Sequence, residues 1–241
     1  YQQKYYASLG GALVHSARLP KNNRQAFSPS VTLGWRISNE DFLSDSSVVN
    51  ELMLTASASI LHTDLDIADY YMYKGAYDQS NVAWWGWADG NQSRASQSLQ
   101  GNNDKMKFIQ RKEFSIGLRG SLWKNLLSFD ASFFINRMEG LLAEATTLYP
   151  NYFKSYWPES SFVPYINYNN HDRKGFDVIL NMNKRVGAVD LGLGVAGTDY
   201  TSKNARLSEL YEYDYQNRTG HPTDGMWGLI TDGFFRDDAD I

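Results

Sequence analysis

Seven stretches of the chain alternate between apolar residues and small or polar residues with a period of two, the pattern of β-strands whose two faces differ. These stretches lie near residues 5–15, 28–36, 51–62, 111–122, 127–138, 174–184 and 187–200. No comparably long stretch has a helical period, and the six prolines lie outside the strand interiors. The sequence therefore predicts an all-β fold of long antiparallel strands.

The two faces of the predicted strands differ in chemistry. Between the ends of the strands, one face holds mostly large apolar residues and no charged residue, whereas the other holds mainly Gly, Ser, Thr and Ala. The charged residues of this second face are Arg119, Asp130, Asp177 and Asp190. A solvated sheet face normally carries many more charges, while small polar residues suit the wall of a wide lumen. Strands of about ten residues with this pattern predict an antiparallel transmembrane β-barrel segment, in which every backbone group is paired.

The connections between the strands are alternately long and short. In chain order they cover residues 16–27, 37–50, 63–110, 123–126, 139–173 and 185–186. Outer-membrane barrels combine short periplasmic turns with long extracellular loops. We therefore expect the loops at 63–110, 139–173 and 201–241 to be extracellular. Four aromatic residues at strand ends are expected to lie in the membrane interface: Trp35, Phe42, Trp123 and Tyr200.

Average composition hides this pattern. Mean hydropathy is −0.48 and the net charge is −4, because long polar loops dilute the strands. The absence of cysteine excludes disulfide scaffolds and thiolate metal sites, and the lack of a Lys/Arg excess argues against nucleic-acid binding. There is no run of about 18 apolar residues, and the first residues show no leader pattern. We therefore expect neither a transmembrane helix nor a signal peptide in this chain.

Several ordered segments resemble the SusC/RagA-type TonB-dependent outer-membrane transporters. The segments that carry the resemblance are Lys21–Arg24 with Pro29–Leu43, Glu113–Leu118, Asn136–Leu142, Lys174–Asp177 and Gly220–Phe235. Together they span nearly the whole chain. The only departure within a motif is Asp177, where the family more often has Glu.

The resemblance implies a nutrient importer of the outer membrane of a Gram-negative bacterium. In that family a barrel of about 22 strands is closed by a plug and covered by a SusD-like surface lipoprotein. The pair takes up an oligosaccharide or a peptide, and the TonB complex acts on the plug. Residues 1–241 would be an internal part of one barrel domain, with about seven strands and without the plug, the TonB-interacting segment or the C-terminal strands. The resemblance implies no cofactor and no enzymatic activity.

The 63–110 loop holds the candidate substrate-binding residues. Trp84, Trp85 and Trp87 offer flat aromatic faces beside Asp89 and Asn91, whose polar groups suit sugar hydroxyls. The alternative is that these aromatic residues pack against neighbouring loops or the lipoprotein partner.

The 139–173 loop repeats the aromatic pattern. Tyr149, Tyr152, Tyr156 and Trp157 are expected to contact a partner, because prolines limit the flexibility of this loop. The charged residues Arg119, Asp130, Asp177 and Asp190 are expected to face the lumen and to contact the plug more often than the substrate.

Other functions have less support in the sequence. The acidic runs at 64–69 and 237–240 lack the Gly and distal Glu of a calcium loop, so no metal site is predicted. A barrel hydrolase would need a nucleophile and a base that no motif supplies. The main alternative is a soluble, aromatic-rich β-sandwich that binds glycans, in which the apolar strand face would be a buried core.

Overall fold

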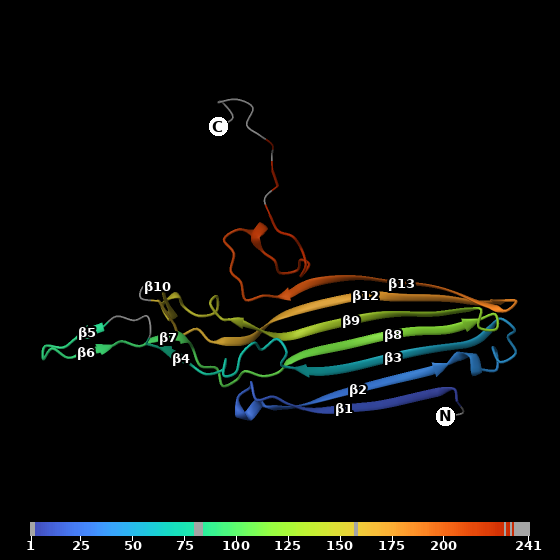
Figure 1. Cartoon of the computed structure of the whole chain (residues 1–241), viewed down its shortest axis with the longest axis horizontal. Coiled ribbons are helices and arrows are strands. Elements are labelled where there is room, and N and C mark those ends of the chain that lie inside the picture. Colours follow the sequence, from blue (N-terminus) through green and yellow to red (C-terminus); the bar gives the residue numbers. More distant parts are fainter. Residues whose placement is uncertain (1–2, 80–83, 157–158, 229, 232, 234–241) are drawn as a thin grey trace.

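A computed structural model describes residues 3–79, 84–156, 159–228, 230–231 and 233. Seven long antiparallel strands form one sheet in the order β1-β2-β3-β8-β9-β12-β13 (Figure 1). They are β1 (Tyr5–His15), β2 (Gln25–Arg36), β3 (Val49–Thr63), β8 (Ile109–Leu122), β9 (Leu127–Glu144), β12 (Tyr165–Val186) and β13 (Val189–Arg206). Each predicted strand is present, and the all-β antiparallel fold is confirmed. The sheet is an open wall within the described part of the chain.

The pairing register gathers the apolar positions of all seven strands on one face. Directly opposed residues lie on the same face of a sheet. One such row crosses the sheet through Leu9, Val31, Ala58, Phe114, Ile135, Lys174 and Thr201. We call the face of this row the apolar face and the opposite one the polar face. Large side chains of the apolar face are exposed, with Leu9 at 84% and Leu193 at 63%.

The apolar band crosses the sheet obliquely. On β1 the band is centred on Leu9, and on β13 it is centred on Leu193. The row that starts at Leu9 reaches β13 at Thr201, so the centre shifts by eight residues over six steps between strands. With about 3.3 Å per residue and about 4.8 Å between strands, the strands make an angle of about 42° with the normal to the band.

Three strands continue beyond the predicted limits. Residues 139–144 of β9 pair with residues 165–170 of β12, so the expected 139–173 loop is shorter than predicted. Strand β13 likewise extends to Arg206. On β9 the extension includes Leu141 and Leu142, which pack against buried loop residues, and on β12 register shifts between residues 167 and 170 break the alternation. The period of two is lost there, which is why the pattern could not mark these strand ends.

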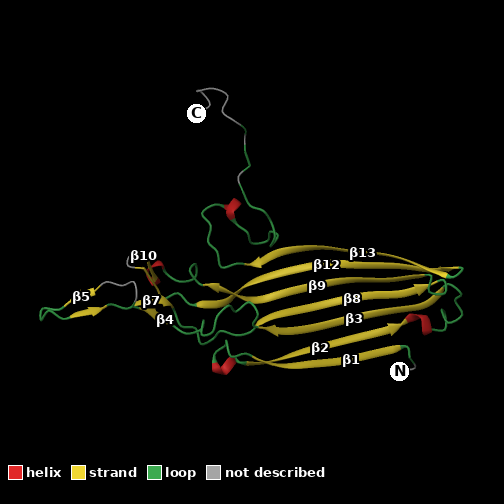
Figure 2. Ribbon diagram, in the orientation of Figure 1, coloured by secondary structure: helices red, strands yellow, loops and turns green. Residues whose placement is uncertain are grey.

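Successive connections lie alternately at the two ends of the sheet, and the two longest, β3–β8 and β9–β12, share one end (Figure 2). One end, called the short-turn end, holds the β2–β3, β8–β9 and β12–β13 connections. The helix η2 (Ile37–Asn39) lies in the β2–β3 connection. The other end holds η1 (Lys21–Asn23), η3 (Asn151–Phe153) and η4 (Asp214–Gln216). It also holds the small hairpins β4 (Ala76–Asp78) with β7 (Gln97–Gln100), β5 (Trp84–Gly86) with β6 (Gln92–Arg94), and β10 (Lys154–Tyr156) with β11 (Glu159–Ser161). No helix among the described residues is long and apolar enough to cross a membrane.

A small core lies beneath the longest loop. Its buried members are Leu19, Ile67, Tyr73, Met106, Phe108 and Ile109. Partly buried residues of the strand ends, including Val14, Ala26 and Met138, pack against it. The loop between β3 and β8 is therefore fastened to the long-loop end of the sheet by apolar packing, and its hairpins project from that anchored base.

Candidate functional site

The charged residues predicted for the lumen share one face. Arg119 and Asp130 are directly opposed on the polar face of β8 and β9, and Asp190 is opposed to Arg185 with Nε and Oδ1 3.7 Å apart. Both pairs are exposed. Each carboxylate of these two pairs thus meets a cation of the same sheet.

Asp177 is the hydrogen-bonding centre of β12 on the polar face. Its Oδ1 accepts a hydrogen bond of 2.7 Å from Thr198 on β13, and its Oδ2 accepts one of 3.4 Å from Ser132 on β9. A carboxylate at this position joins three neighbouring strands. The acidic residue at the end of the Lys174–Asp177 motif therefore has a structural role in the wall, whichever molecule occupies the lumen.

The glycine of the same motif makes room for aromatic rings on the polar face. A Cβ atom on Gly175 would lie 2.4 Å from the carbonyl oxygen of Asp199 and 2.9 Å from the Phe134 ring. Tyr200 is directly opposed to Gly175, and the guanidinium of Arg173 lies 4.6 Å from the Tyr200 ring centre. The expectation that Tyr200 belongs to an interfacial aromatic girdle is wrong, because the register turns this side chain to the polar face.

The tryptophan cluster lies on the hairpin β5–β6, which extends beyond β4, β7 and β10 (Figure 1). Trp84 and Trp87 are exposed. The guanidinium of Arg94 lies 4.9 Å from the Trp84 ring centre, and the indole N–H of Trp87 donates to Ser93 Oγ at 3.2 Å. Trp85 lies between them on β5. The hairpin therefore presents aromatic surface that the rest of the described chain leaves uncovered.

Asp89 and Asn91 form the turn of this hairpin. The Asp89 carboxylate accepts hydrogen bonds from the Asn91 backbone N–H at 3.0 Å and from its side-chain amide at 2.8 Å. These bonds, the backbone bond first, lower the pKa of Asp89. Gly90 completes the turn at a φ of 85°, where glycine is favoured. Both residues predicted to bind substrate therefore hold the hairpin in shape, and contact with a ligand stays a prediction.

The tyrosines of the β9–β12 loop form a second aromatic group. The Tyr149 and Tyr152 rings lie 5.3 Å and 5.1 Å from the Phe153 ring. Tyr152 and Tyr156 are exposed by more than four fifths. Trp157 lies outside the described residues. Among the side chains that the structure describes, no ring contact joins this group to the tryptophan hairpin.

Residues that the sequence did not single out join the two loops. The Asn103 side-chain amide donates to the Tyr165 carbonyl at 2.7 Å, and the Gly101 backbone N–H donates to the Val163 carbonyl. A Cβ atom on Gly101 would lie 2.0 Å from the carbonyl oxygen of Phe162. Isolated asparagine and glycine residues in a polar loop give no periodic signal, so only the structure reveals this contact between loops.

The acidic run of the first long loop also serves to fix the loop. Asp64 Oδ2 accepts a hydrogen bond of 2.5 Å from Ser16 Oγ, and Arg18 donates to the Asp64 and Ile67 carbonyls. Among the described residues, no group of three His, Asp or Glu side chains is arranged to hold a metal ion. The acidic run at 237–240 lies outside the described residues.

At the short-turn end, Glu40 ties together the start of β1 and the end of β2. Its Oε1 accepts hydrogen bonds from the Trp35 indole at 2.9 Å and the Tyr5 hydroxyl at 3.0 Å, and its Oε2 accepts one from Lys4 at 3.1 Å. These three donors, the Trp35 indole first, lower the pKa of Glu40. Trp35 thus turns its polar edge toward the short turns and its ring toward the apolar face, as an interfacial aromatic does.

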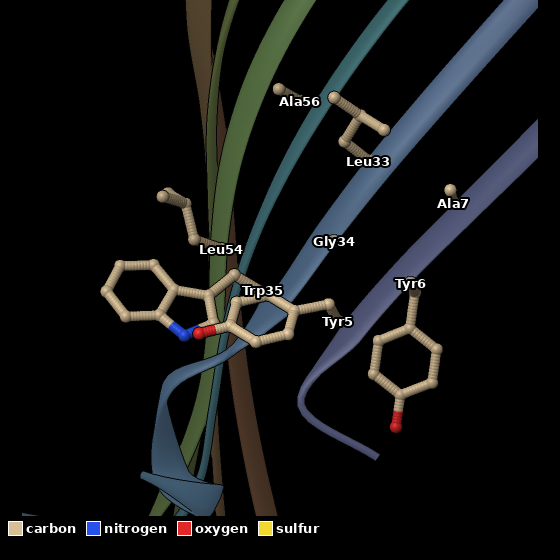
Figure 3. A pocket seen from close by; sticks show the side chains of 8 residues that line it. All are labelled: Tyr5, Tyr6, Ala7, Leu33, Gly34, Trp35, Leu54 and Ala56. Carbon is tan, nitrogen blue, oxygen red and sulfur yellow. The ribbon is translucent and has the colours of Figure 1, made fainter. Parts of the chain in front are cut away.

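A shallow hollow of about 530 Å³ opens on the apolar face beside this cluster (Figure 3). Its lining includes Tyr5, Ala7, Leu33, Trp35, Leu54 and Ala56. The lining is almost wholly apolar, so this surface suits hydrocarbon and not water.

The described geometry defines a class of protein. The apolar band is nine residues deep on β1, β2, β3, β8 and β9, and on β13 it reaches the same depth when Gly197, the last uncharged residue before Asp199, is counted. The angle of about 42° lies within the range of about 35–45° for strands of transmembrane barrels. No described element covers the apolar face, and its large side chains are exposed (Figure 2). The chain is a segment of a membrane-spanning β-barrel.

Comparison of the sequence with known proteins gives two similar receptors. No family model matches the sequence. TonB-dependent receptor P3 of Formosa agariphila is 24% identical over 189 residues, covering 75% of this chain and 17% of that protein. TonB-dependent receptor P26 of the same organism is 23% identical over 146 residues, covering 61% of this chain and 14% of that protein.

Solved structures show the same fold. The RagAB peptide transporter aligns with a TM-score of 0.67, and the RagAB peptide importer in its closed-closed state with a TM-score of 0.66. Each alignment has 16% identity and covers 85% of this chain and 21% of that chain. The chain thus spans about a fifth or less of the proteins it matches. Its sequence is similar to proteins named TonB-dependent receptor, and its sheet has the fold of a barrel segment of the RagAB structures.

Proposed function

We propose that this chain forms part of the wall of an active importer in the outer membrane of a Gram-negative bacterium. The observation that carries the proposal is the oblique apolar band on one face of the seven-stranded sheet, opposite a face of small and polar residues. In this proposal residues 1–241 belong to a single barrel domain. The long-loop end faces the cell exterior and the short turns face the periplasm, as in other outer-membrane barrels.

The proposed importer is energised through TonB and works with a SusD-like surface lipoprotein. The relatives named TonB-dependent receptor support the first part, and the two-component RagAB importers support a partner at the cell surface. The exposed Tyr152 and Tyr156 are proposed partner contacts. Arg119, Asp130, Asp177 and Asp190 line the wall where a plug would lie. The segment contributes transport and no catalysis.

The proposed cargo is an oligosaccharide or a peptide. Exposed indole rings such as Trp84 and Trp87 suit both, because they stack on sugar C–H faces and on apolar or cationic side chains. The peptide alternative has support from the RagAB importers, whose structures share the fold. Contact of Trp84, Trp85, Trp87, Asp89 and Asn91 with cargo belongs to this proposal.

The proposal is tested with the complete protein and its gene deletion. The protein should fractionate with outer membranes and leave them only in detergent, and the deletion strain should lose growth on the imported nutrient. Growth on oligosaccharide and on peptide pools, compared between the deletion and wild-type strains, separates the two cargo classes. Recovery of the complete protein as a stable soluble monomer would overturn the membrane assignment and favour the glycan-binding sandwich.

A further inference from the structure

On β12 and β13, the border of the apolar band nearest the long-loop end carries two lysines that form no ion pair in the described part of the chain. Lys174 and Lys203 lie on the apolar face and are exposed. Lys174 is opposed to Thr201, and Lys203 follows Thr201 by two residues on the same strand, so the two lysines are diagonal neighbours. Diagonal positions of a ladder lie about 7–8 Å apart. Two ammonium groups at this spacing can bind one anion.

The other charges of this border are already neutralised or lie apart. Arg137 donates to both oxygens of the Asp172 carboxylate at 2.7 Å and 2.9 Å, and Lys112 pairs with Glu139. Neither Lys174 nor Lys203 forms an ion pair in the described part of the chain; Asp172 is directly opposed to Lys203, but its carboxylate is held by Arg137. The charges of this border that remain outside ion pairs are therefore the two lysines and the carboxylate of Asp199, one row nearer the middle of the band.

A hollow of about 360 Å³ lies at the same place. Lys174, Thr201 and Lys203 line it together with Asp172, Ile135 on β9 and Pro222 of the following segment. The segment is held against β13 by backbone hydrogen bonds between Asn204 and residues 220–221. The hollow thus has two lysines, a hydroxyl and the Arg137-paired carboxylate of Asp172 among its polar groups, and an isoleucine among its apolar ones.

The position of the hollow identifies the kind of molecule that fits it. Phe133 and Phe176 of the apolar face lie one row nearer the middle of the band. Asp199 is opposed to Phe176 in that row, so an anionic group is repelled there and favoured in the row of Lys174 and Thr201. A ligand with an anionic head beside the lysines and hydrocarbon along the phenylalanines satisfies both chemistries.

We propose that Lys174, Lys203 and Thr201 bind the phosphate of a phosphorylated lipid of the outer leaflet, whose acyl chains lie along the apolar face. The proposal rests on the membrane orientation of the proposed function. Phosphate accepts charge-assisted hydrogen bonds from both ammonium groups and a hydrogen bond from the hydroxyl. Lysines at a membrane border also extend toward water without binding a particular lipid, and the test separates these two cases.

The test uses the complete protein purified in detergent and mixed with a phosphorylated glycolipid of the outer leaflet or its dephosphorylated form. Retained lipid is measured by native mass spectrometry. The Lys174→Gln/Lys203→Gln double variant should retain the phosphorylated lipid about fivefold less or worse than the wild type, because two charge-assisted hydrogen bonds are lost. The dephosphorylated lipid should be retained weakly by both proteins.

Lys184→Gln is the matched control. Lys184 lies on the same strand and face as Lys174, at the opposite border of the band. Its replacement should leave retention of the phosphorylated lipid unchanged. If the control and the double variant lost the phosphorylated lipid equally, any lysine at a border of the band would have the same effect. That result would overturn the proposal. Displacement of the lipid by excess inorganic phosphate would also overturn it, because the site would then take free phosphate.

Nutrient uptake by the same variants separates this inference from the proposed function. Outer-membrane location and uptake with unchanged lipid retention in the double variant would refute the lipid site alone. Absence of the wild-type protein from the outer membrane would refute the proposed function and its orientation.

Discussion

Arg119 on β8 and Asp130 on β9 are directly opposed across the ladder, with Nη2 and Oδ2 2.7 Å apart on the polar face. Arg137 and Asp172 are opposed in the same way on β9 and β12, but the Asp172 side chain is only 17% exposed and accepts two hydrogen bonds. These two pairs have the same ladder geometry and differ in exposure.

A double-mutant cycle should therefore give different coupling energies for the two pairs. Alanine variants of Arg119 and Asp130, single and combined, should show a coupling of about 0.2–1 kcal/mol, as exposed pairs do. The Arg137–Asp172 cycle should give a larger coupling, because the second pair is bidentate and better shielded. Unfolding of the complete protein in urea and lipid measures both. Equal couplings would contradict the difference in environment.

Leu180 should tolerate no charge. It lies near the middle of the band on the apolar face of β12. Replacing it with arginine should destabilise the protein in lipid by about 2–4 kcal/mol, since the charge must enter hydrocarbon. Asn181→Arg is the matched control, because the neighbouring side chain lies on the polar face and should cost far less. Similar losses for the two variants would mean that the faces have been assigned incorrectly. Urea titration in vesicles gives both values.

Gly175 should be intolerant of any side chain. Its Cβ position is within 2.6 Å of the Tyr200 Cβ atom and closer still to a backbone oxygen. Gly175→Ala should destabilise the protein by about 1–3 kcal/mol, the usual range for overpacking. The same substitution at Gly197, whose Cβ position has no atom within 4 Å, should be nearly neutral. Thermal unfolding of the two variants tests this, and a neutral Gly175→Ala would exclude the close packing on the polar face.

The tryptophan hairpin can be tested by its function. Joint replacement of Trp84, Trp85 and Trp87 by alanine should weaken cargo binding by at least about fivefold if two rings stack on cargo, at about 0.5–1.5 kcal/mol for each aromatic contact. Assembly with the lipoprotein should persist. Isothermal titration with cargo and pull-down of the partner measure the two effects. Lost assembly with unchanged cargo affinity would favour the alternative, in which the rings pack against the partner.

The Glu40 cluster should depend on pH. Because hydrogen bonds lower the pKa of Glu40 in the folded protein, its contribution to stability is fully present above the unfolded pKa, about 4.3. The contribution is lost as the pH falls through the lower, folded pKa. The NMR resonance of the Trp35 indole N–H should therefore shift only below about pH 4.3. Glu40→Gln should abolish this shift, and the Trp123 indole in a neighbouring turn is the internal control. A shift already complete near neutral pH would contradict the low pKa.

The sequence alone was sufficient to locate the strands and their faces. A period of two leaves a signal wherever one face meets hydrocarbon, and the row from Leu9 to Thr201 confirms the resulting register. The signal fails beyond the band, where Leu141 and Leu142 of β9 pack against loop residues and register shifts interrupt the alternation of β12. For that reason the ends of β9 and β12 were wrong in the sequence-based prediction. Tyr200 was assigned to the girdle from its place at a strand end alone, whereas the alternation of β13 puts its side chain on the polar face.

The loops were less predictable for a related reason. Met106 and Phe108 are buried under the β3–β8 loop, but they stand in a polar stretch without any period. Likewise, the roles of Asp89 and Asn91 follow from hydrogen bonds between residues two apart in a turn. Residue type suggested binding chemistry at these positions, and only the geometry shows that the same groups first build the turn.

The inclination of the strands also sets the radius that a closed barrel built from such strands would have. A strand inclined by about 42° occupies about 6.5 Å of perimeter instead of about 4.8 Å. Seven such strands supply about 45 Å of circumference, and a ring of about 22 would have a radius near 23 Å. The band centre at Leu193 lies eight residues from Thr201, the residue that the row from Leu9 reaches on β13. This offset therefore measures how wide the closed barrel would be. Inserting or deleting a pair of residues within one strand would change the inclination of the strands and so the radius of the barrel.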